Sequence, residues 1–205
     1  STVLSTNTDG IKTLSLSNQE ITDLKKTLMT EWVPAQGEAQ GKGIIDTILN
    51  RKASGKWGDS ITDVVNADRQ FSAINGPEGW KIGKHNVSDY ADSDLMSGKG
   101  KLSSDLVDRY LKERAGGAAS SVGDHLNYAN PQYSDAKNLE WINKLDGPQL
   151  GGHKHGTTAD NQRFRPGEFG IQLPGQAAST KGLGIMGISP TATNNAIGTG
   201  TYSEI

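Results

Sequence analysis

One glutamate, Glu38, lies between glycines in the stretch GEAQGKG, just before an apolar run that ends in ILNR. Gly37 and Gly41 keep side chains away from it, so a bulky ligand could approach. No basic residue closely precedes it, and three aromatic residues nearby in the sequence could form an apolar wall: Trp32, Trp57 and Phe71. Such surroundings raise the pKa of a carboxyl group. A carboxyl that stays protonated at neutral pH can act as a general acid, as cleavage of a glycosidic bond requires.

Glu38 also has an ordinary structural interpretation, because a negative charge in the first turn of a helix is favourable. A hydrolytic glycosidase would in addition need a second carboxylate. The candidates are Asp59, Asp63 and Asp124. Asp59 lies in a helix-capping context and Asp124 in a Gly-Asp turn, so structural roles explain these two equally well.

Three histidines suggest a competing chemistry, because His125, His153 and His155 could together bind Zn²⁺ with one open position. Against this, GGHKHG has the composition of a flexible loop, and the chain contains no HExxH motif. We therefore expect no metal and no other cofactor.

Helical periodicity predicts the elements that would position these residues. A first helix should begin at Ser17 or Asn18, with Glu20 in its first turn. A second helix should carry ILNR and end near Gly55. A short helix capped by Asp59 or Ser60 should follow it.

A further long helix should begin at Ser103 or Ser104 and close at Gly116-Gly117. Strand signals are scarce, and the candidate segment is 126–128. We therefore predict a mainly α, compact helical domain with long loops over residues 18–157. Residues 1–17 are predicted to be an exposed arm, and the Gly-, Thr- and Asn-rich residues 158–205 a C-terminal tail or docking segment.

Composition narrows the possible partners. The 21 Lys and Arg residues nearly balance the 23 Asp and Glu residues, and there is no basic run, so we expect no nucleic-acid partner. No apolar stretch is long enough to span a bilayer, and the first ten residues lack the basic and apolar regions of a signal peptide, so we expect no membrane insertion. Without cysteine, stability depends on packing.

Five stretches resemble, in the same order, the blocks of the cell-wall hydrolase family typified by the spore cortex-lytic enzyme SleB. They are GEAQGKGIIDTILNR, WGDSITDVV, QFS at 70–72, VGDHLNYANP at 122–131 and LGGH at 150–153. The resemblance covers about residues 28–155, and the first and fourth blocks are the specific ones. It implies an α+β fold related to lysozyme and lytic transglycosylases, with peptidoglycan glycan strands as the substrate.

The resemblance assigns the glutamate of the GEA block, Glu38, as the essential acid. It also matches Tyr128 and Asn130 to the tyrosine and asparagine of the family's YFNP block, in which Ala129 replaces the usual aromatic residue. Together with Gln70, Phe71 and Ser72, these residues would line the glycan groove, with Phe71 or Trp57 as a stacking face. Phe71 could equally belong to the core, and Asn130-Pro131 could be only a turn.

The sequence therefore predicts a lytic transglycosylase that cleaves the bond between N-acetylmuramic acid and N-acetylglucosamine with one glutamate as acid and base, acting at the cell wall or periplasm. Two alternatives stay open. One is a hydrolytic muramidase that uses a second acid. The other is a structural component, for instance of a bacteriophage virion, whose domain binds glycan while its tail docks to other virion or cell-envelope proteins.

Overall fold

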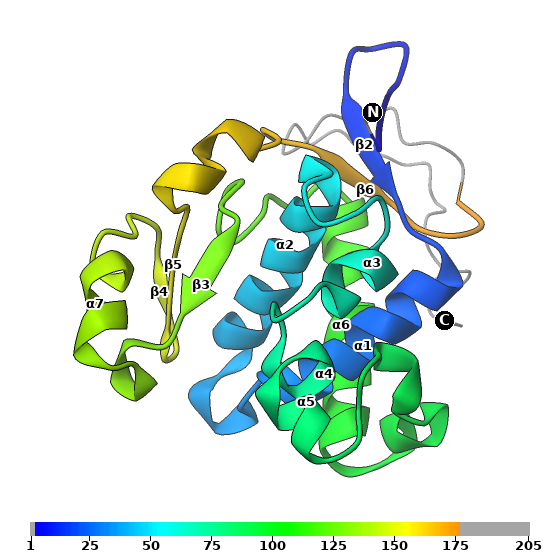
Figure 1. Cartoon of the computed structure of the whole chain (residues 1–205). Coiled ribbons are helices and arrows are strands. Elements are labelled where there is room, and N and C mark those ends of the chain that lie inside the picture. The colour runs from blue at the N-terminus through cyan, green and yellow to red at the C-terminus, as the bar shows by residue number, and fades with distance from the viewer. Residues whose placement is uncertain (1–2, 177–205) are drawn as a thin grey trace.

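The computed structural model describes residues 3–176, and this part of the chain is mainly helical, with two small β-sheets (Figure 1). The α-helices are α1 (Asn18–Glu31), α2 (Glu38–Ser54), α3 (Ile61–Asn66), α4 (Ser72–Asn75), α5 (Pro77–Lys81), α6 (Gly98–Ala115) and α7 (Ala136–Ile142). The 3-10 helices are η1 (Pro34–Gln36), η2 (Val87–Asp89), η3 (Asp92–Met96), η4 (Pro131–Tyr133) and η5 (Ala159–Phe164). No helix among the described residues is long and apolar enough to cross a membrane. The prediction of a mainly α chain is confirmed.

Local sequence explains where the first three helices begin or end. Ser17 and Glu20 form a capping box at the predicted start of α1, each side chain accepting a hydrogen bond from the backbone N–H of the other. Helix α2 ends at Gly55, which has a φ of 74° that glycine adopts readily. Ser60 caps α3 through the backbone N–H of Asp63. The predicted boundaries of these helices are confirmed.

Helix α6 begins at Gly98, earlier than the predicted start at Ser103 or Ser104. Its first turn contains glycines, which are poor helix formers, so the sequence pattern did not indicate it. Gly100 is needed there, because a Cβ atom at this position would lie 1.8 Å from the backbone oxygen of Asp94. The close approach lets η3 pack against α6. The predicted end is confirmed, since Gly116 follows the last helical residue.

Helix α2 packs against α1, α3 and α6 on one side and faces the sheet of β3, β4 and β5 on the other (Figure 1). Gly41 of α2 is buried under Trp32 and Leu106, and a Cβ atom there would lie 2.5 Å from Cδ2 of Leu106. Gly41 is therefore a packing residue, and the prediction that it opens a path for a ligand is wrong. Its small size lets α1 and α6 approach α2 closely.

A buried polar cluster also joins α2 to α6. The carboxylate of Asp46, which is fully buried, pairs with the guanidinium of Arg114. It also accepts hydrogen bonds from the Tyr110 hydroxyl at 2.5 Å and from the Ser121 backbone N–H at 2.7 Å. Because the buried charge is paired and fully hydrogen-bonded, it fixes the two helices to each other and to the segment after α6.

Two three-stranded sheets flank the helices. The first has the order β1 (Leu4–Thr6), β2 (Lys12–Ser15), β6 (Gly170–Gln172), with β1 antiparallel and β6 parallel to β2. The second has the order β3 (Asn127–Ala129), β5 (His153–Gly156), β4 (Gln149–Leu150), all antiparallel. Only β3 lies where the sequence analysis placed a strand. The others have two to four residues, too few to show an alternating pattern.

The predicted domain limits at 17 and 157 are wrong for the described residues. Leu14 and Leu16 of the predicted arm are buried in the core. So are Phe169, Ile171 and Leu173 of the predicted tail, and Ile171 pairs with Leu14 across β2 and β6. Both ends contain few apolar residues and join the core through pairing of β2 with β6, which a local sequence pattern does not indicate. The rest of the predicted tail, 177–205, with its docking role, lies outside the described residues.

Candidate functional site

Glu38 does not have the apolar surroundings that the sequence predicted. It is the first residue of α2, and its side chain is about half exposed. The Arg109 guanidinium of α6 donates to both carboxylate oxygens, at 3.3 and 2.8 Å. This contact lowers the pKa of Glu38, which is the opposite of the predicted shift. Glu38 is therefore a stable carboxylate at a helix start, poorly suited to donate a proton.

A second glutamate, Glu31, has the properties predicted for Glu38. It is the last residue of α1, and its Oε1 accepts a hydrogen bond of 2.6 Å from the Tyr128 hydroxyl of β3. Burial raises the pKa of the Glu31 carboxyl, while the Tyr128 hydrogen bond and the charges of Arg51 and Lys99 act in the lowering direction. Glu31 is therefore held ready to carry a proton at higher pH than an ordinary glutamate.

Sequence reasoning missed Glu31, although one signal pointed to it. An acidic residue in the last turn of a helix lies at the negative end of the helix dipole, where it is unfavourable. Helix α1 has no basic residue in that turn to compensate. A glutamate placed there against local preference suggests a role in the tertiary structure or in function.

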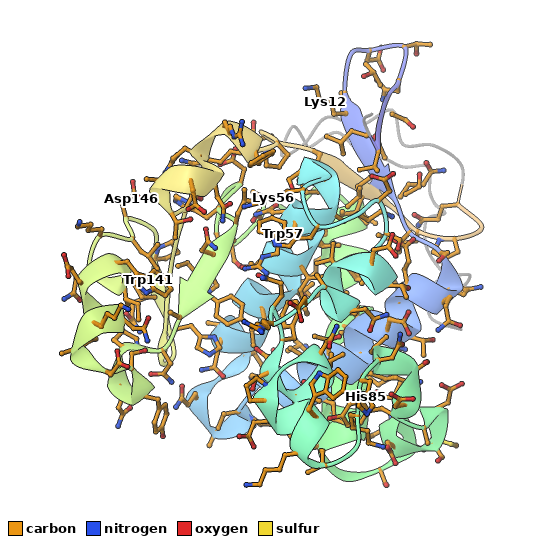
Figure 2. The ribbon with its side chains drawn as sticks, viewed as in Figure 1. Lys12, Lys56, Trp57, His85, Trp141 and Asp146 are labelled. Carbon is orange, nitrogen blue, oxygen red and sulfur yellow. The ribbon has the colours of Figure 1, made fainter. Side chains whose placement is uncertain are left out.

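Arg51, in the last turn of α2, is the second charged residue of this cluster, and its charge acts on Glu31. It is 6% exposed, and its Nε donates to the backbone oxygen of Leu126 at 2.8 Å. Its Nη1 donates to Oε1 of Gln70 at 3.0 Å. The guanidinium lies 4.5 Å from the Trp57 ring centroid, and Figure 2 shows Trp57 just beyond the C-terminal end of α2. The side chain thus ties α2 to the loop before α4 and to the start of β3.

The predicted sugar-binding residues separate into two groups. Gln70 is hydrogen-bonded to Arg51 and Tyr128 to Glu31, and Ser72 lies exposed at the start of α4. Phe71 is only 2% exposed and belongs to the core, so its prediction as a stacking face is wrong. Asn130 caps η4, because its side chain accepts a hydrogen bond from the Gln132 backbone N–H. Of the two interpretations of Asn130, this contact fits the structural one, a residue of the Asn130-Pro131 turn.

The histidine segment is a strand, β5, and the prediction of a flexible loop is wrong. His153 stacks on Tyr128 with ring centroids 4.5 Å apart. His155 is fully buried, with Nδ1 3.3 Å from the Thr47 hydroxyl of α2. Burial lowers the pKa of His153 to about 4 and that of His155 to about 3, so both are neutral. Within residues 3–176, no group of three His, Cys, Asp or Glu side chains could hold a metal ion.

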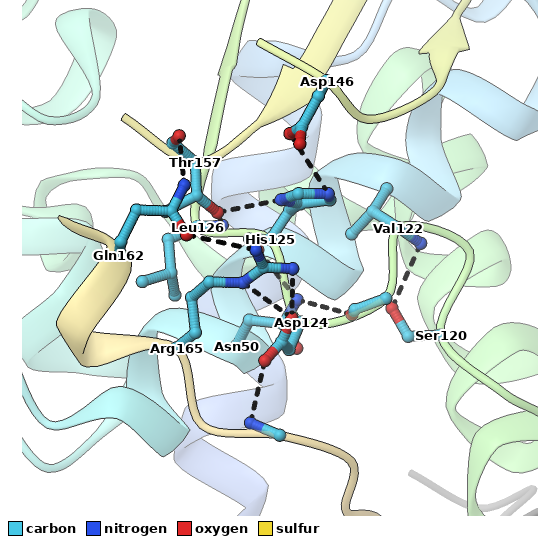
Figure 3. Close-up of polar contacts among 12 residues, drawn as sticks. Asn50, Ser120, Val122, Asp124, His125, Leu126, Asp146, Thr157, Gln162 and Arg165 are labelled. Carbon is cyan, nitrogen blue, oxygen red and sulfur yellow. Dashed lines mark hydrogen bonds and ion pairs between the residues drawn. The ribbon is translucent and has the colours of Figure 1, made fainter. Parts of the chain in front are cut away.

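None of the three predicted second acids contacts Glu31. Asp59 and Asp63 are exposed near the start of α3. Asp124 is bound through Oδ1 by Arg165 at 2.7 Å and through Oδ2 by the backbone N–H of Gly167 at 3.0 Å (Figure 3). The charged groups that act on Glu31 are the two cations Arg51 and Lys99. The cluster therefore offers one protonatable carboxyl with hydrogen-bonding neighbours, which is suited to proton transfer at a single position.

No protein-family model, curated protein or solved structure matches the chain.

Proposed function

We propose that the chain is a peptidoglycan lytic transglycosylase, with Glu31 in the role that the sequence analysis gave to Glu38. The observation that carries the proposal is the environment of Glu31, a carboxyl whose pKa is raised by burial and which is hydrogen-bonded to Tyr128. Glycosidic cleavage needs such a group, because the leaving oxygen must receive a proton as positive charge develops on the sugar.

The arrangement of the resembled blocks adds independent support. Arg51 comes from ILNR, Gln70 from QFS, Tyr128 from YANP and His153 from LGGH. Tyr128 contacts both His153 and Glu31, Arg51 holds Gln70, and the charge of Arg51 acts on Glu31. The blocks are far apart in the sequence, so their convergence on a carboxyl is what a catalytic centre requires. Glu38, although inside the first block, is instead paired with Arg109 of α6.

In the proposed reaction, the neutral Glu31 carboxyl donates its proton to the bridging oxygen between N-acetylmuramic acid and N-acetylglucosamine. The C1–O bond breaks, and the Glu31 carboxylate then takes the proton from the C6 hydroxyl of the muramic acid as its oxygen bonds to C1. The products are a 1,6-anhydro sugar and a free 4-hydroxyl, and Glu31 is again neutral. The reaction needs no second carboxylate and consumes no water. This agrees with a centre that contains one acid.

Mass spectrometry of the products from purified peptidoglycan tests the proposal. Anhydro-muropeptides support it, whereas reducing ends would identify a hydrolytic muramidase. If the chain sediments with peptidoglycan but releases no soluble fragments, the glycan-binding structural component is the better description. A lysozyme-related fold and action at the cell wall belong to the same proposal and depend on this result.

A further inference from the structure

Arg51 is a buried cation without an ion pair. Among the described residues, no Asp or Glu side chain lies within salt-bridge distance of its guanidinium, unlike the buried Arg114, which pairs with Asp46. Burial lowers the pKa of Arg51 to about 10, and the nearby Tyr128 and Glu31 act to raise it. A buried charge is costly unless an opposite charge compensates it. The Glu31 carboxyl is the acid whose charge acts on Arg51, and the charge of Arg51 in turn favours the carboxylate form of Glu31.

The same side chain also determines how Gln70 points. A guanidinium only donates hydrogen bonds, so the Gln70 atom at 3.0 Å from Arg51 Nη1 has to be the carbonyl oxygen. The amide nitrogen of Gln70 then lies on the other side, where it donates a long hydrogen bond of 3.3 Å to the backbone oxygen of Asp68. The amide nitrogen carries two N–H groups, and the Asp68 contact uses one of them, which leaves a second donor on this exposed side chain.

We propose that Arg51 is a positioning residue with two tasks. The charge of its guanidinium keeps the Glu31 carboxyl able to release its proton. The Nη1 hydrogen bond to the Gln70 carbonyl oxygen holds the Gln70 amide N–H groups toward a substrate carbonyl. The acetamido group of an N-acetylated sugar is a carbonyl of the required kind. The first task concerns the protein alone, and the second rests on the proposed function. Tyr128 of β3 hydrogen-bonds Glu31, and the charges of Arg51 of α2 and Lys99 of α6 act on it, so three groups influence the Glu31 proton.

The variant Gln70→Glu tests the first task without removing a buried side chain. The new carboxylate would take the place of the amide oxygen beside Arg51 Nη1 and compensate the guanidinium, so that less of its field reaches Glu31. We expect the pKa of Glu31, measured by NMR titration of ¹³C-labelled glutamate carboxyls in the full chain without substrate, to rise by about one unit. The Glu31→Gln variant identifies the Glu31 signal.

Asn18→Asp is the matched control. It makes the same amide-to-acid change at an exposed position at the start of α1, and its negative charge suits a helix N-terminus. Thirteen residues of helix separate it from Glu31, which is about 20 Å. Its effect on Glu31 should be negligible. An unchanged Glu31 pKa in Gln70→Glu, or an equal shift in both variants, would overturn the electrostatic role of Arg51.

Arg51→Lys separates the two tasks, because lysine keeps the charge but cannot bond the Leu126 oxygen and Gln70 as a fork. The Glu31 pKa should stay near its wild-type value, while KM for N-acetylated glycan rises about fivefold through loss of roughly 1 kcal/mol of hydrogen bonding. De-N-acetylated glycan should show no such increase. A KM increase that is equal for both glycans would contradict the orientation of Gln70. If the wild-type protein cleaves no glycan, the proposed function fails while the titration still decides the charge effect.

Discussion

The hydroxyl of Tyr128 donates a 2.6 Å hydrogen bond to Oε1 of Glu31, and the two residues lie 97 positions apart in the chain. The bond joins the end of α1 to the β3–β5–β4 sheet. Burial and the neighbouring Glu31 carboxylate raise the pKa of Tyr128 well above its usual value, so its hydroxyl keeps its proton and stays a donor. A donor favours the carboxylate form of Glu31, whereas burial favours the protonated form.

The two glutamates form a matched pair for mutagenesis. Glu31→Gln keeps the size of the side chain but cannot donate a proton, so we expect glycan release to fall at least a hundredfold. Glu38→Gln removes half of an exposed ion pair with Arg109 and should leave turnover within about twofold. Release of dyed fragments from peptidoglycan measures both, with circular dichroism to verify folding. If Glu38→Gln is inactive while Glu31→Gln stays active, the catalytic acid is Glu38 and not Glu31.

Tyr128→Phe should raise the pKa of Glu31 by about one unit, because a hydrogen bond to a charged group contributes roughly 1.5–3 kcal/mol and part of it is replaced by solvent. In the pH profile of kcat, the alkaline limb reports the acid that must be protonated, so it should move to higher pH. The ring still stacks on His153, which limits the loss of stability. An alkaline limb that stays in place would mean that Glu31 is not the titrating acid.

The local parts of the fold were predictable from sequence. The starts of α1 and α3 and the end of α2 follow from a capping box, a serine cap and a glycine with positive φ, all of which depend on a few adjacent residues. The parts that failed depend on distant partners. Strand β6 exists because it pairs with β2, and nothing within GIQ itself indicates this.

The candidate site divides in the same way. Gln70 and Tyr128 were named because residue type and block position pointed to them, and both lie beside Arg51 or Glu31. The identity of the acid could not be decided from adjacent residues. Arg109, which lowers the pKa of Glu38, is 71 positions away, and Tyr128, which contacts Glu31, is 97 positions away. The absence of a nearby basic residue in sequence was therefore a poor guide to the charge environment.

His155→Ala should destabilise the protein by about 2–4 kcal/mol, since it removes a fully buried ring that contacts α2 beside Gly43 and Thr47. Urea unfolding measures the change. His85→Ala is the control, because His85 is exposed and its ring contacts only the exposed Trp80 among the aromatic rings of the described residues, so it should cost about 1 kcal/mol or less. A neutral result for His155→Ala would show that β5 does not pack against α2 as described.

The buried histidines also predict how stability depends on pH. The unfolded chain has histidine pKa values near 6.5, whereas the folded values are about 4 for His153 and about 3 for His155. Between pH 6.5 and 5 the unfolded chain therefore binds protons that the folded chain does not, and stability falls as the pH falls. The slope is on the order of 1 kcal/mol per pH unit for each histidine. Urea unfolding at several pH values in this window should show a smaller slope for His153→Phe than for the wild-type protein.

Truncation tests where the domain ends. A chain that stops after residue 157 loses β6, the three core residues Phe169, Ile171 and Leu173, and the contact of Arg165 with Asp124. Burying each large apolar side chain contributes about 1.5–3 kcal/mol, and three of them approach the whole stability of a domain of this size. We therefore expect 1–157 to lack a cooperative thermal transition.

A chain that stops after residue 176 keeps all of these contacts and should unfold cooperatively, with Glu31-dependent glycan release intact. Cooperative unfolding of 1–157 would show that the core is stable without β6.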